Sequence, residues 1–232
     1  MKIRKAVIIM ITLNLCLMGL LFLHKQDFYK SAMSFTKGDR KIALTFDDGP
    51  HPSCTEELLD GLKERNVQAT FFVTGQNAEK YPDIIRRAKK ESHLIGNHTY
   101  SHMQLTKRNE EAFKKELVKT NDILKKITGE DVLFVRPPYG CWSKNFEKEL
   151  NMLPVLWNID PLDWCSEDAE CISNIVLSKI RINKNKGKEI EHNWIILLHD
   201  QYDTSVEAAF MIVDELQKEG YTFVTVEEIL LD

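Results

Sequence analysis

The sequence lacks the patterns that identify several common classes of protein. It contains no P-loop and no dinucleotide-type glycine pattern, which removes the usual sequence argument for a nucleotide cofactor. It has no Cys-x-x-Cys pair, so a structural zinc knot is not expected. Its formal net charge of −4 gives no indication of a nucleic-acid partner. With 232 residues, 43% of them hydrophobic, the chain can form one sizeable domain with a single core.

The amino terminus carries an apolar segment. Lys2, Arg4 and Lys5 precede residues 6–23, which contain no charged side chain. This length is at the short end for a membrane-spanning helix and at the long end for a signal-peptide core. Small residues are missing at the positions expected before a cleavage site. We therefore predict an uncleaved membrane anchor at residues 1–25, with a cleaved signal peptide as the alternative.

The charges that flank this segment predict its orientation. More basic residues lie before it than directly after it, which places the rest of the chain outside the cytoplasm. We expect a single-pass protein of the cell membrane with an extracytoplasmic domain, or a secreted protein if the segment is cleaved. Residues 26–38 lack clear periodicity and are predicted to form a tether, followed by one domain at residues 39–232.

The cysteines leave the redox state open. Cys16 lies in the apolar segment, and Cys54, Cys141, Cys165 and Cys171 belong to the predicted domain. Free thiols and one or two disulfides are both compatible with these four, because export permits oxidation without enforcing it.

Strands and helices alternate along the domain, joined by short loops. This order predicts an α/β protein with a parallel sheet and crossover helices. Polar clusters follow several of the strands, and function collects at the carboxyl ends of strands in such folds. The expected strands are residues 41–46, 68–74, 94–95, 132–135, 154–159, 194–198 and 222–226, and the expected helices are residues 54–65, 83–92, 110–128, 143–152, 169–182 and 206–219.

Two adjacent carboxylates, Asp47 and Asp48, end the first predicted strand. Gly49 and Pro50 bend the chain there, so both side chains can approach one cavity from different directions. One carboxylate could then hold a divalent cation while its neighbour accepts a proton from water. The alternative is that Asp-Asp-Gly is only a surface turn.

His98 and His102 are spaced for a shared cation. If their loop makes one helical turn, the two imidazoles lie on the same face. Together with Asp48 they would form a two-histidine, one-carboxylate set, which leaves positions open for water and substrate. The alternative is a pair of surface or packing histidines.

Further candidates lie at the ends of later strands. His199 follows an apolar strand, and a carboxylate such as Asp163 could hold one ring nitrogen, raise its pKa and make the ring a general acid. Otherwise His199 is a packing residue. Arg136 precedes two prolines and could pair with Asp47 or another carboxylate, or be an ordinary surface arginine.

Three residues could contact a substrate. Trp164 and Leu198 could line a small apolar pocket beside the metal, or belong to the core. The ring of Tyr139 could stack on a sugar, and its backbone N–H could donate to an oxyanion.

Five motifs, in the order TFDDGP, HTYSH, RPPYG, DPLDW and LLHD, resemble those of the NodB-homology polysaccharide deacetylases, carbohydrate esterase family four. The similarity extends from residue 41 to the carboxyl terminus. It implies that residues 39–232 form a catalytic domain, a distorted (β/α) barrel of about seven parallel strands. It also implies metal-dependent removal of N-acetyl groups from amino sugars.

The resemblance also implies roles at the metal. Asp47 would be the general base, braced by Arg136. Asp48, His98 and His102 would hold the divalent ion, with zinc favoured over cobalt or a similar metal.

Around the substrate, the resemblance implies that the backbone N–H of Tyr139 stabilises the oxyanion. His199, tuned by Asp163, would protonate the departing amine. Trp164 and Leu198 would surround the acetyl methyl group.

The expected partner is a glycan, and an outward-facing, anchored enzyme makes cell-wall glycan the most available one. We expect N-acetylglucosamine residues of peptidoglycan or chitin-like oligosaccharides as substrate. Alternatives are an acetylated xylan, a muramic-acid residue or a cyclic amide. A different class of function is a membrane-tethered glycan-binding domain without turnover. The sequence indicates no particular oligomeric state.

Overall fold

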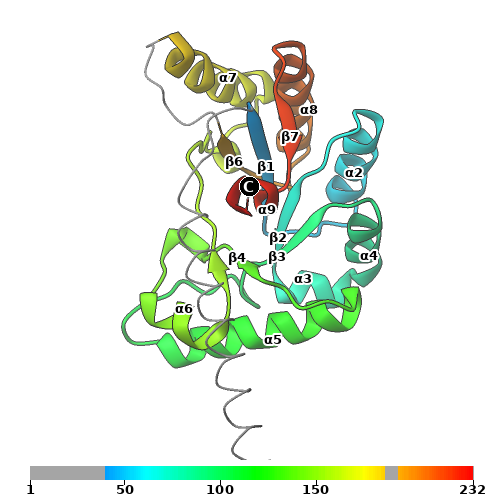
Figure 1. The fold of residues 1–232 in the computed structure, drawn as a ribbon. Coiled ribbons are helices and arrows are strands. Elements are labelled where there is room, and N and C mark those ends of the chain that lie inside the picture. The colour runs from blue at the N-terminus through cyan, green and yellow to red at the C-terminus, as the bar shows by residue number, and fades with distance from the viewer. Residues whose placement is uncertain (1–39, 186–192, 232) are drawn as a thin grey trace, which may run out of the picture.

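The computed structural model describes residues 40–185 and 193–231. In these ranges, parallel strands form one curled sheet with helices around its outside (Figure 1). The strands are β1 (Lys41–Asp47), β2 (Thr70–Val73), β3 (Leu94–Asn97), β4 (Phe134–Val135), β5 (Leu153–Pro154), β6 (Trp194–His199) and β7 (Thr222–Val224). The helices are α2 (Cys54–Glu64), α3 (Gly75–Lys80), α4 (Pro82–Lys90), α5 (Glu110–Thr128), α6 (Lys144–Leu150), α7 (Ala169–Asn185), α8 (Asp203–Lys218) and α9 (Val226–Leu231), with 3₁₀ turns at Pro138–Gly140 and Asp163–Cys165.

The sheet has the strand order β5-β4-β3-β2-β1-β6, and β7 pairs with the first residues of β1. The two outer strands of this order approach each other beyond β5, where Ile159 pairs with Ile196 of β6. There the N–H of Leu197 donates to the carbonyl of Ile159 at 2.9 Å. The prediction of a distorted barrel of about seven parallel strands is therefore confirmed.

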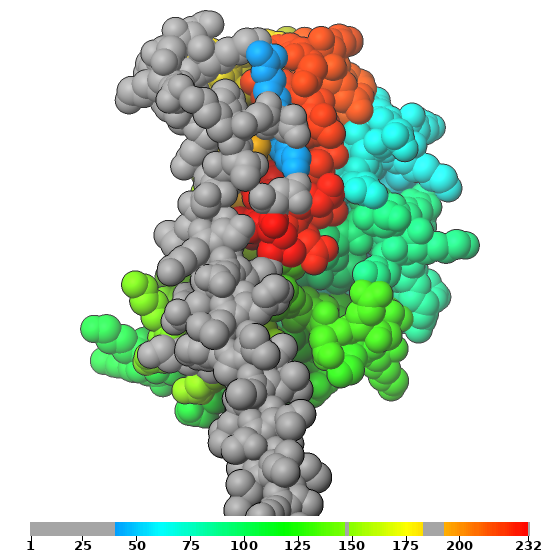
Figure 2. Space-filling view, in the orientation of Figure 1, coloured from blue at the N-terminus to red at the C-terminus, as the bar shows by residue number. Residues whose placement is uncertain are grey.

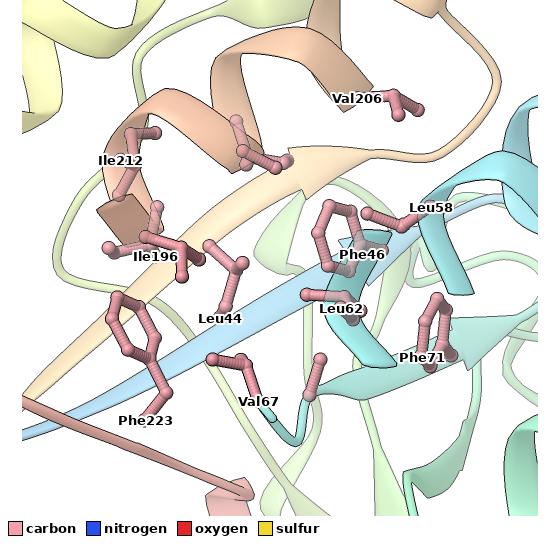
Figure 3. Close-up of a cluster of buried hydrophobic side chains, with 14 of the residues drawn as sticks. Leu44, Phe46, Leu58, Leu62, Val67, Phe71, Ile196, Val206, Ile212 and Phe223 are labelled. Atoms are coloured by element: carbon pink, nitrogen blue, oxygen red, sulfur yellow. The ribbon is translucent and has the colours of Figure 1, made fainter. Parts of the chain in front are cut away.

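The outer face of the sheet packs against the helices. In β1, alternate residues Leu44 and Phe46 point outward and are fully or almost fully buried. Figure 3 shows them beside side chains of α2 and α8. The apolar residues of α2, such as Leu58 and Leu62, recur at helical spacing, so one face of that helix is buried against the sheet.

A second apolar layer fills the inside of the barrel. It includes Ala43 of β1, Phe72 of β2 and Ile195 of β6, together with Val226 and Ile229 of α9. Figure 1 draws α9 in the middle of the ring of strands, and Figure 2 shows its red atoms beside the blue atoms of β1. The helix α9 lies near the beginnings of the strands, where the N–H of Val226 donates to Oγ1 of Thr70, the first residue of β2. The polar side chains therefore gather at the opposite, carboxyl end.

Most predicted elements agree with the structure, and α5 matches its predicted bounds. Gly129 ends that helix in the left-handed conformation, with φ of 80°. The predicted strand at residues 154–159 is wrong. Pro154 cannot donate a ladder hydrogen bond, and the chain then crosses towards β6, where only Ile159 pairs. The helices α3 and α9 were not predicted, because six residues are too short to show a helical period.

The four cysteines of the domain are free thiols. Cys54 is buried, and its thiol donates to Asp203 at 3.0 Å. Burial and this carboxylate raise the pKa of Cys54. Of the two redox states compatible with the sequence, the structure has the reduced one.

None of the helices in the described ranges is long and apolar enough to cross a bilayer. The predicted anchor at residues 1–25 and the tether at residues 26–38 lie outside those ranges. Both stay predictions from the sequence.

A glycine of β3 tests the tight packing inside the barrel. We expect Gly96→Ala to lower the free energy of unfolding by about 1–3 kcal/mol, because a methyl group there would collide with the ring of Phe72. The lower conformational entropy of the unfolded chain would by itself raise the free energy of unfolding by about 0.4–1 kcal/mol. Urea denaturation measures the difference. The steric explanation also requires a smaller loss in a Phe72→Leu background, and equal losses in both backgrounds would contradict it.

Candidate active site

The carboxyl ends of two adjacent strands, β1 and β6, bring the first candidate residues together. Asp47 of β1 is the direct neighbour of His199 of β6, and Figure 1 shows these strands side by side. Because successive side chains alternate, Thr45 lies on the same face of β1 as Asp47. That face lines the inside of the barrel at its carboxyl end.

A buried ion pair lies beneath this end. Arg136 follows β4 and is completely buried, and its Nη1 donates to Asp47 Oδ1 at 2.9 Å and to Thr45 Oγ1 at 2.6 Å. Its Nε donates to the carbonyl of Val155 at 3.2 Å. Its guanidinium lies 4.3 Å from the ring centre of Phe72. Burial lowers the pKa of Arg136, and the charge of Asp47 opposes that shift.

Asp48 faces the two histidines. It adopts the left-handed conformation, with φ of 74°, which turns its side chain away from the strand direction of Asp47. Its Oδ1 lies 3.3 Å from His98 Nε2 and 3.4 Å from His102 Nε2. Burial alone would raise the pKa of Asp48, but the imidazoles outweigh burial and lower it.

The three side chains fit a divalent cation. One ligand atom from each of Asp48, His98 and His102 lies within 4.8 Å of the others. Asp48 Oδ1 is buried and has no hydrogen-bond partner among the described residues, as expected of an oxygen that a cation would satisfy. His98 Nδ1 donates to the carbonyl of Arg136 at 2.6 Å, which leaves Nε2 as the ligand atom. The donor set suits zinc and similar metals.

The pKa values of the two imidazoles shift in opposite directions. Burial alone would lower the pKa of His98, but the carboxylates of Asp47 and Asp48 outweigh burial and raise it. Burial lowers the pKa of His102. The two rings are 5.0 Å apart between their centres.

His199 is held by one carboxylate. Asp163 Oδ1 accepts from His199 Nδ1 at 2.9 Å, and its Oδ2 accepts from the backbone N–H of His199 at 2.7 Å. Ser205 Oγ also donates to Oδ2, at 2.7 Å. Burial alone would lower the pKa of His199, but Asp163 and the nearby carboxylates outweigh burial and raise it to about 9. The ring is therefore a proton donor at neutral pH.

Two aromatic residues flank the site. Tyr139 has φ of 59°, is 65% exposed and lies edge-on to the ring of His102, with centres 5.1 Å apart. Trp164 directly follows Asp163 and is 56% exposed. Both side chains are thus open to a large ligand.

The expectation that Leu198 lines an apolar pocket is wrong. Leu198 is fully buried in the outer layer, where it is the β-sheet neighbour of Phe46. It points away from the face that carries His199, because the two residues are adjacent in the strand. Leu197 would be the residue on that face.

Sequence reasoning missed two supporting residues. Thr45 accepts from Arg136 and donates to the carbonyl of Ile196 at 2.6 Å. The two-residue period of β1 could have placed it beside Asp47. Ser205 lies in the first turn of α8, and no sequence pattern connects it to Asp163.

Comparisons of sequence and of structure with known proteins find the same family that the five sequence motifs resemble. A family model described as polysaccharide deacetylase matches residues 35–156. The peptidoglycan-N-acetylglucosamine deacetylase of Bacillus cereus is 41% identical over 204 residues, which cover 85% of this chain and 70% of that protein. The peptidoglycan-N-acetylmuramic acid deacetylase PdaC of Bacillus subtilis is 38% identical over 188 residues.

The similarity to PdaC covers 81% of this chain but only 38% of PdaC. The solved structure of the peptidoglycan deacetylase PdaC matches with a TM-score of 0.74 and 37% identity, over 83% of this chain and 90% of that chain. The chain thus corresponds to one part of PdaC.

The contact between Asp163 and His199 predicts a titration. In the metal-free protein we expect Asp163→Asn to lower the pKa of His199 from about 9 towards its ordinary 6.5, because the amide carries no charge. Because the pKa of His199 is raised in the folded state, its protonation stabilises the folded protein fully below pH 6.5. This contribution is lost as the pH rises to about 9. The unfolding free energy should therefore fall less over this range in the variant.

NMR titration of the histidine rings measures the pKa, and urea denaturation at several pH values measures the stability. Ser205→Ala is the matched control, because it removes a hydrogen bond from Asp163 but leaves its charge. A His199 pKa that is the same in Asp163→Asn and the wild type would contradict the prediction.

Proposed function

This chain belongs to the polysaccharide deacetylase family, and on that premise we propose that it hydrolyses N-acetyl groups on N-acetylglucosamine residues of peptidoglycan or chitin-like oligosaccharides. The observation that carries the proposal is that three sets of side chains lie together at one end of the barrel. These are the Asp48–His98–His102 set, the Asp47–Arg136 pair and the Asp163–His199 pair.

We assign Asp48, His98 and His102 as ligands of a divalent cation, with zinc preferred. A cation bound there supplies Lewis acidity, which polarises an amide carbonyl and lowers the pKa of water. The carbonyl of Arg136 keeps His98 in the tautomer that such binding requires.

Asp47 is assigned as the general base. Arg136 occupies its Oδ1, and its Oδ2 lies 3.7 Å from His98 Nε2, on the side of the proposed ligands. The carboxylate can therefore take a proton from a water that attacks the acetamide carbon. The ion pair with Arg136 also fixes the orientation of this carboxylate.

His199 is assigned as the general acid. Because Asp163 accepts from Nδ1, the proton on Nε2 is the one available to a substrate. As the C–N bond breaks, His199 gives this proton to the departing nitrogen, and the products are acetate and a free amine. Without protonation the amide nitrogen is a poor leaving group.

The remaining assignments concern substrate contact. The backbone N–H of Tyr139 would donate to the oxygen on which negative charge develops. Trp164, with its exposed ring, would lie against the acetyl group or a sugar. Leu197 takes the place that the sequence had suggested for Leu198.

Location favours the cell wall as the source of substrate. The predicted anchor at residues 1–25 would keep the domain at the outer surface of the membrane, and cleavage would release it as a secreted enzyme. A muramic-acid residue is a second candidate substrate, because PdaC, a relative at 38% identity, is named for that sugar.

Release of acetate tests the proposed reaction. We expect the purified protein to release acetate from peptidoglycan or from chitooligosaccharides, to lose this activity with a chelator and to regain it with zinc. Mass spectrometry of digested peptidoglycan identifies which sugar has lost its acetyl group. Binding of glycan without acetate release in the presence of added metal would instead support a glycan-binding domain.

The assignments also predict that two groups of variants behave differently. Asp47→Asn and His199→Ala should lower kcat by about 100- to 10,000-fold and keep the metal, because these side chains only move protons. His98→Ala and His102→Ala should lose the metal as well as the activity. Metal analysis beside acetate assays separates the groups. Full activity of Asp47→Asn would refute its role as the base.

A further inference from the structure

One carboxylate outside the proposed site holds the loop that carries both histidines. Glu116 lies in α5 and is half-buried. Its Oε2 accepts from the backbone N–H of Tyr100 at 3.1 Å and of Ser101 at 2.8 Å. Its Oε1 accepts from Ser101 Oγ at 2.7 Å. A charged acceptor strengthens each of these hydrogen bonds.

The loop needs such support because its backbone is unusual. Thr99 has φ of 64° and His102 has φ of 58°, which are unfavourable values for side chains other than glycine and most of all for a β-branched residue. The loop therefore keeps this conformation only where surrounding contacts stabilise it.

Contacts from two helices and a strand supply this stabilisation. Gly75 and Gln76 of α3 donate their N–H groups to the carbonyls of Thr99 and Tyr100, at 2.9 and 3.0 Å. Asn97 of β3 accepts from the N–H of Thr99 at 2.8 Å. Figure 1 shows α3 beside α5 below the sheet, so the loop is held between them. Glu116 is the contact from α5 to the loop's N–H groups.

The two histidines depend on this loop to different degrees. His98 is buried, and both its ring and its backbone N–H have partners, in Arg136 and in Val73. The ring of His102 is one-third exposed, at 33%, and contacts Asp48, His98 and Tyr139. The position of His102 is therefore set mainly by its backbone, which follows directly after the residues that Glu116 holds.

We propose that Glu116 is a positioning residue for the cation site, acting through the backbone of Tyr100 and Ser101 to keep His102 opposite Asp48 and His98. This inference rests on the proposed metal-binding role of those three residues. Glu116 is not one of the proposed cation ligands. Its loss would let the loop relax from its left-handed turns and move one ligand away from the other two.

Metal binding tests the proposal without any substrate. We expect Glu116→Ala to weaken zinc affinity by about 10- to 100-fold, the range for residues that orient metal ligands. The absorption spectrum of the cobalt-substituted protein should change, because it reports ligand geometry. Glu116→Gln keeps one oxygen acceptor, so its zinc affinity should lie between those of wild type and Glu116→Ala.

Ser101→Ala removes only the hydroxyl hydrogen bond, and its effect should be smaller and not additive with that of Glu116→Ala. If Glu116→Ala does not fold, the two milder variants, Glu116→Gln and Ser101→Ala, test the proposal. Glu111→Ala is the matched control, since it removes another carboxylate of α5, one that faces Lys114. Its zinc affinity and cobalt spectrum should equal those of the wild type.

A merely structural role would give a different result. In that case the variants of Glu116 would lower the free energy of unfolding of the metal-free protein but keep wild-type zinc affinity and cobalt spectrum, and the proposal would be overturned. The proposed function fails separately, if the wild type binds zinc tightly but releases no acetate from any tested glycan.

Discussion

The buried ion pair between Asp47 and Arg136 is the interaction on which the rest of this structure depends. Arg136 is completely buried, and a charge in that position must be paired because its desolvation is costly. The pair joins β1 to the chain after β4, across the inside of the barrel. The backbone carbonyl of the same arginine accepts from His98 Nδ1. One buried arginine thus contacts both the proposed base, Asp47, and one proposed metal ligand, His98.

Unfavourable backbone conformations gather at the same end of the barrel. Asp48, Thr99, His102, Tyr139 and Leu162 all have positive φ. Such residues persist only where their surroundings over-determine them, and they cluster at functional sites. Here the apolar layers provide the rigid support, since α9 fills one end of the barrel and α2 and α8 cover the outer face. The loops at the other end can then hold conformations that would not survive alone.

Local patterns predicted much of the fold and of the candidate site. The helical period of α5 was clear over its whole length, and the short apolar runs gave β1 and β6. The pattern was misleading where a proline interrupted the ladder, as at Pro154, and where a helix had only six residues, as in α9. Leu198 lies in the outer layer and not at the site, because side chains alternate along β6 and His199, the next residue, faces the site.

The sequence by itself determined the fold class and the kinds of side chain that gather at the ends of the strands, because both follow from periodicity and from order along the chain. Only the tertiary structure decided the partners. Arg136 could have paired with any carboxylate, and it pairs with Asp47, 89 residues away. The contacts of Glu116 with the histidine loop are likewise a result of folding. Such contacts depend on strand register and on how each helix is rotated against the sheet, which no local pattern encodes.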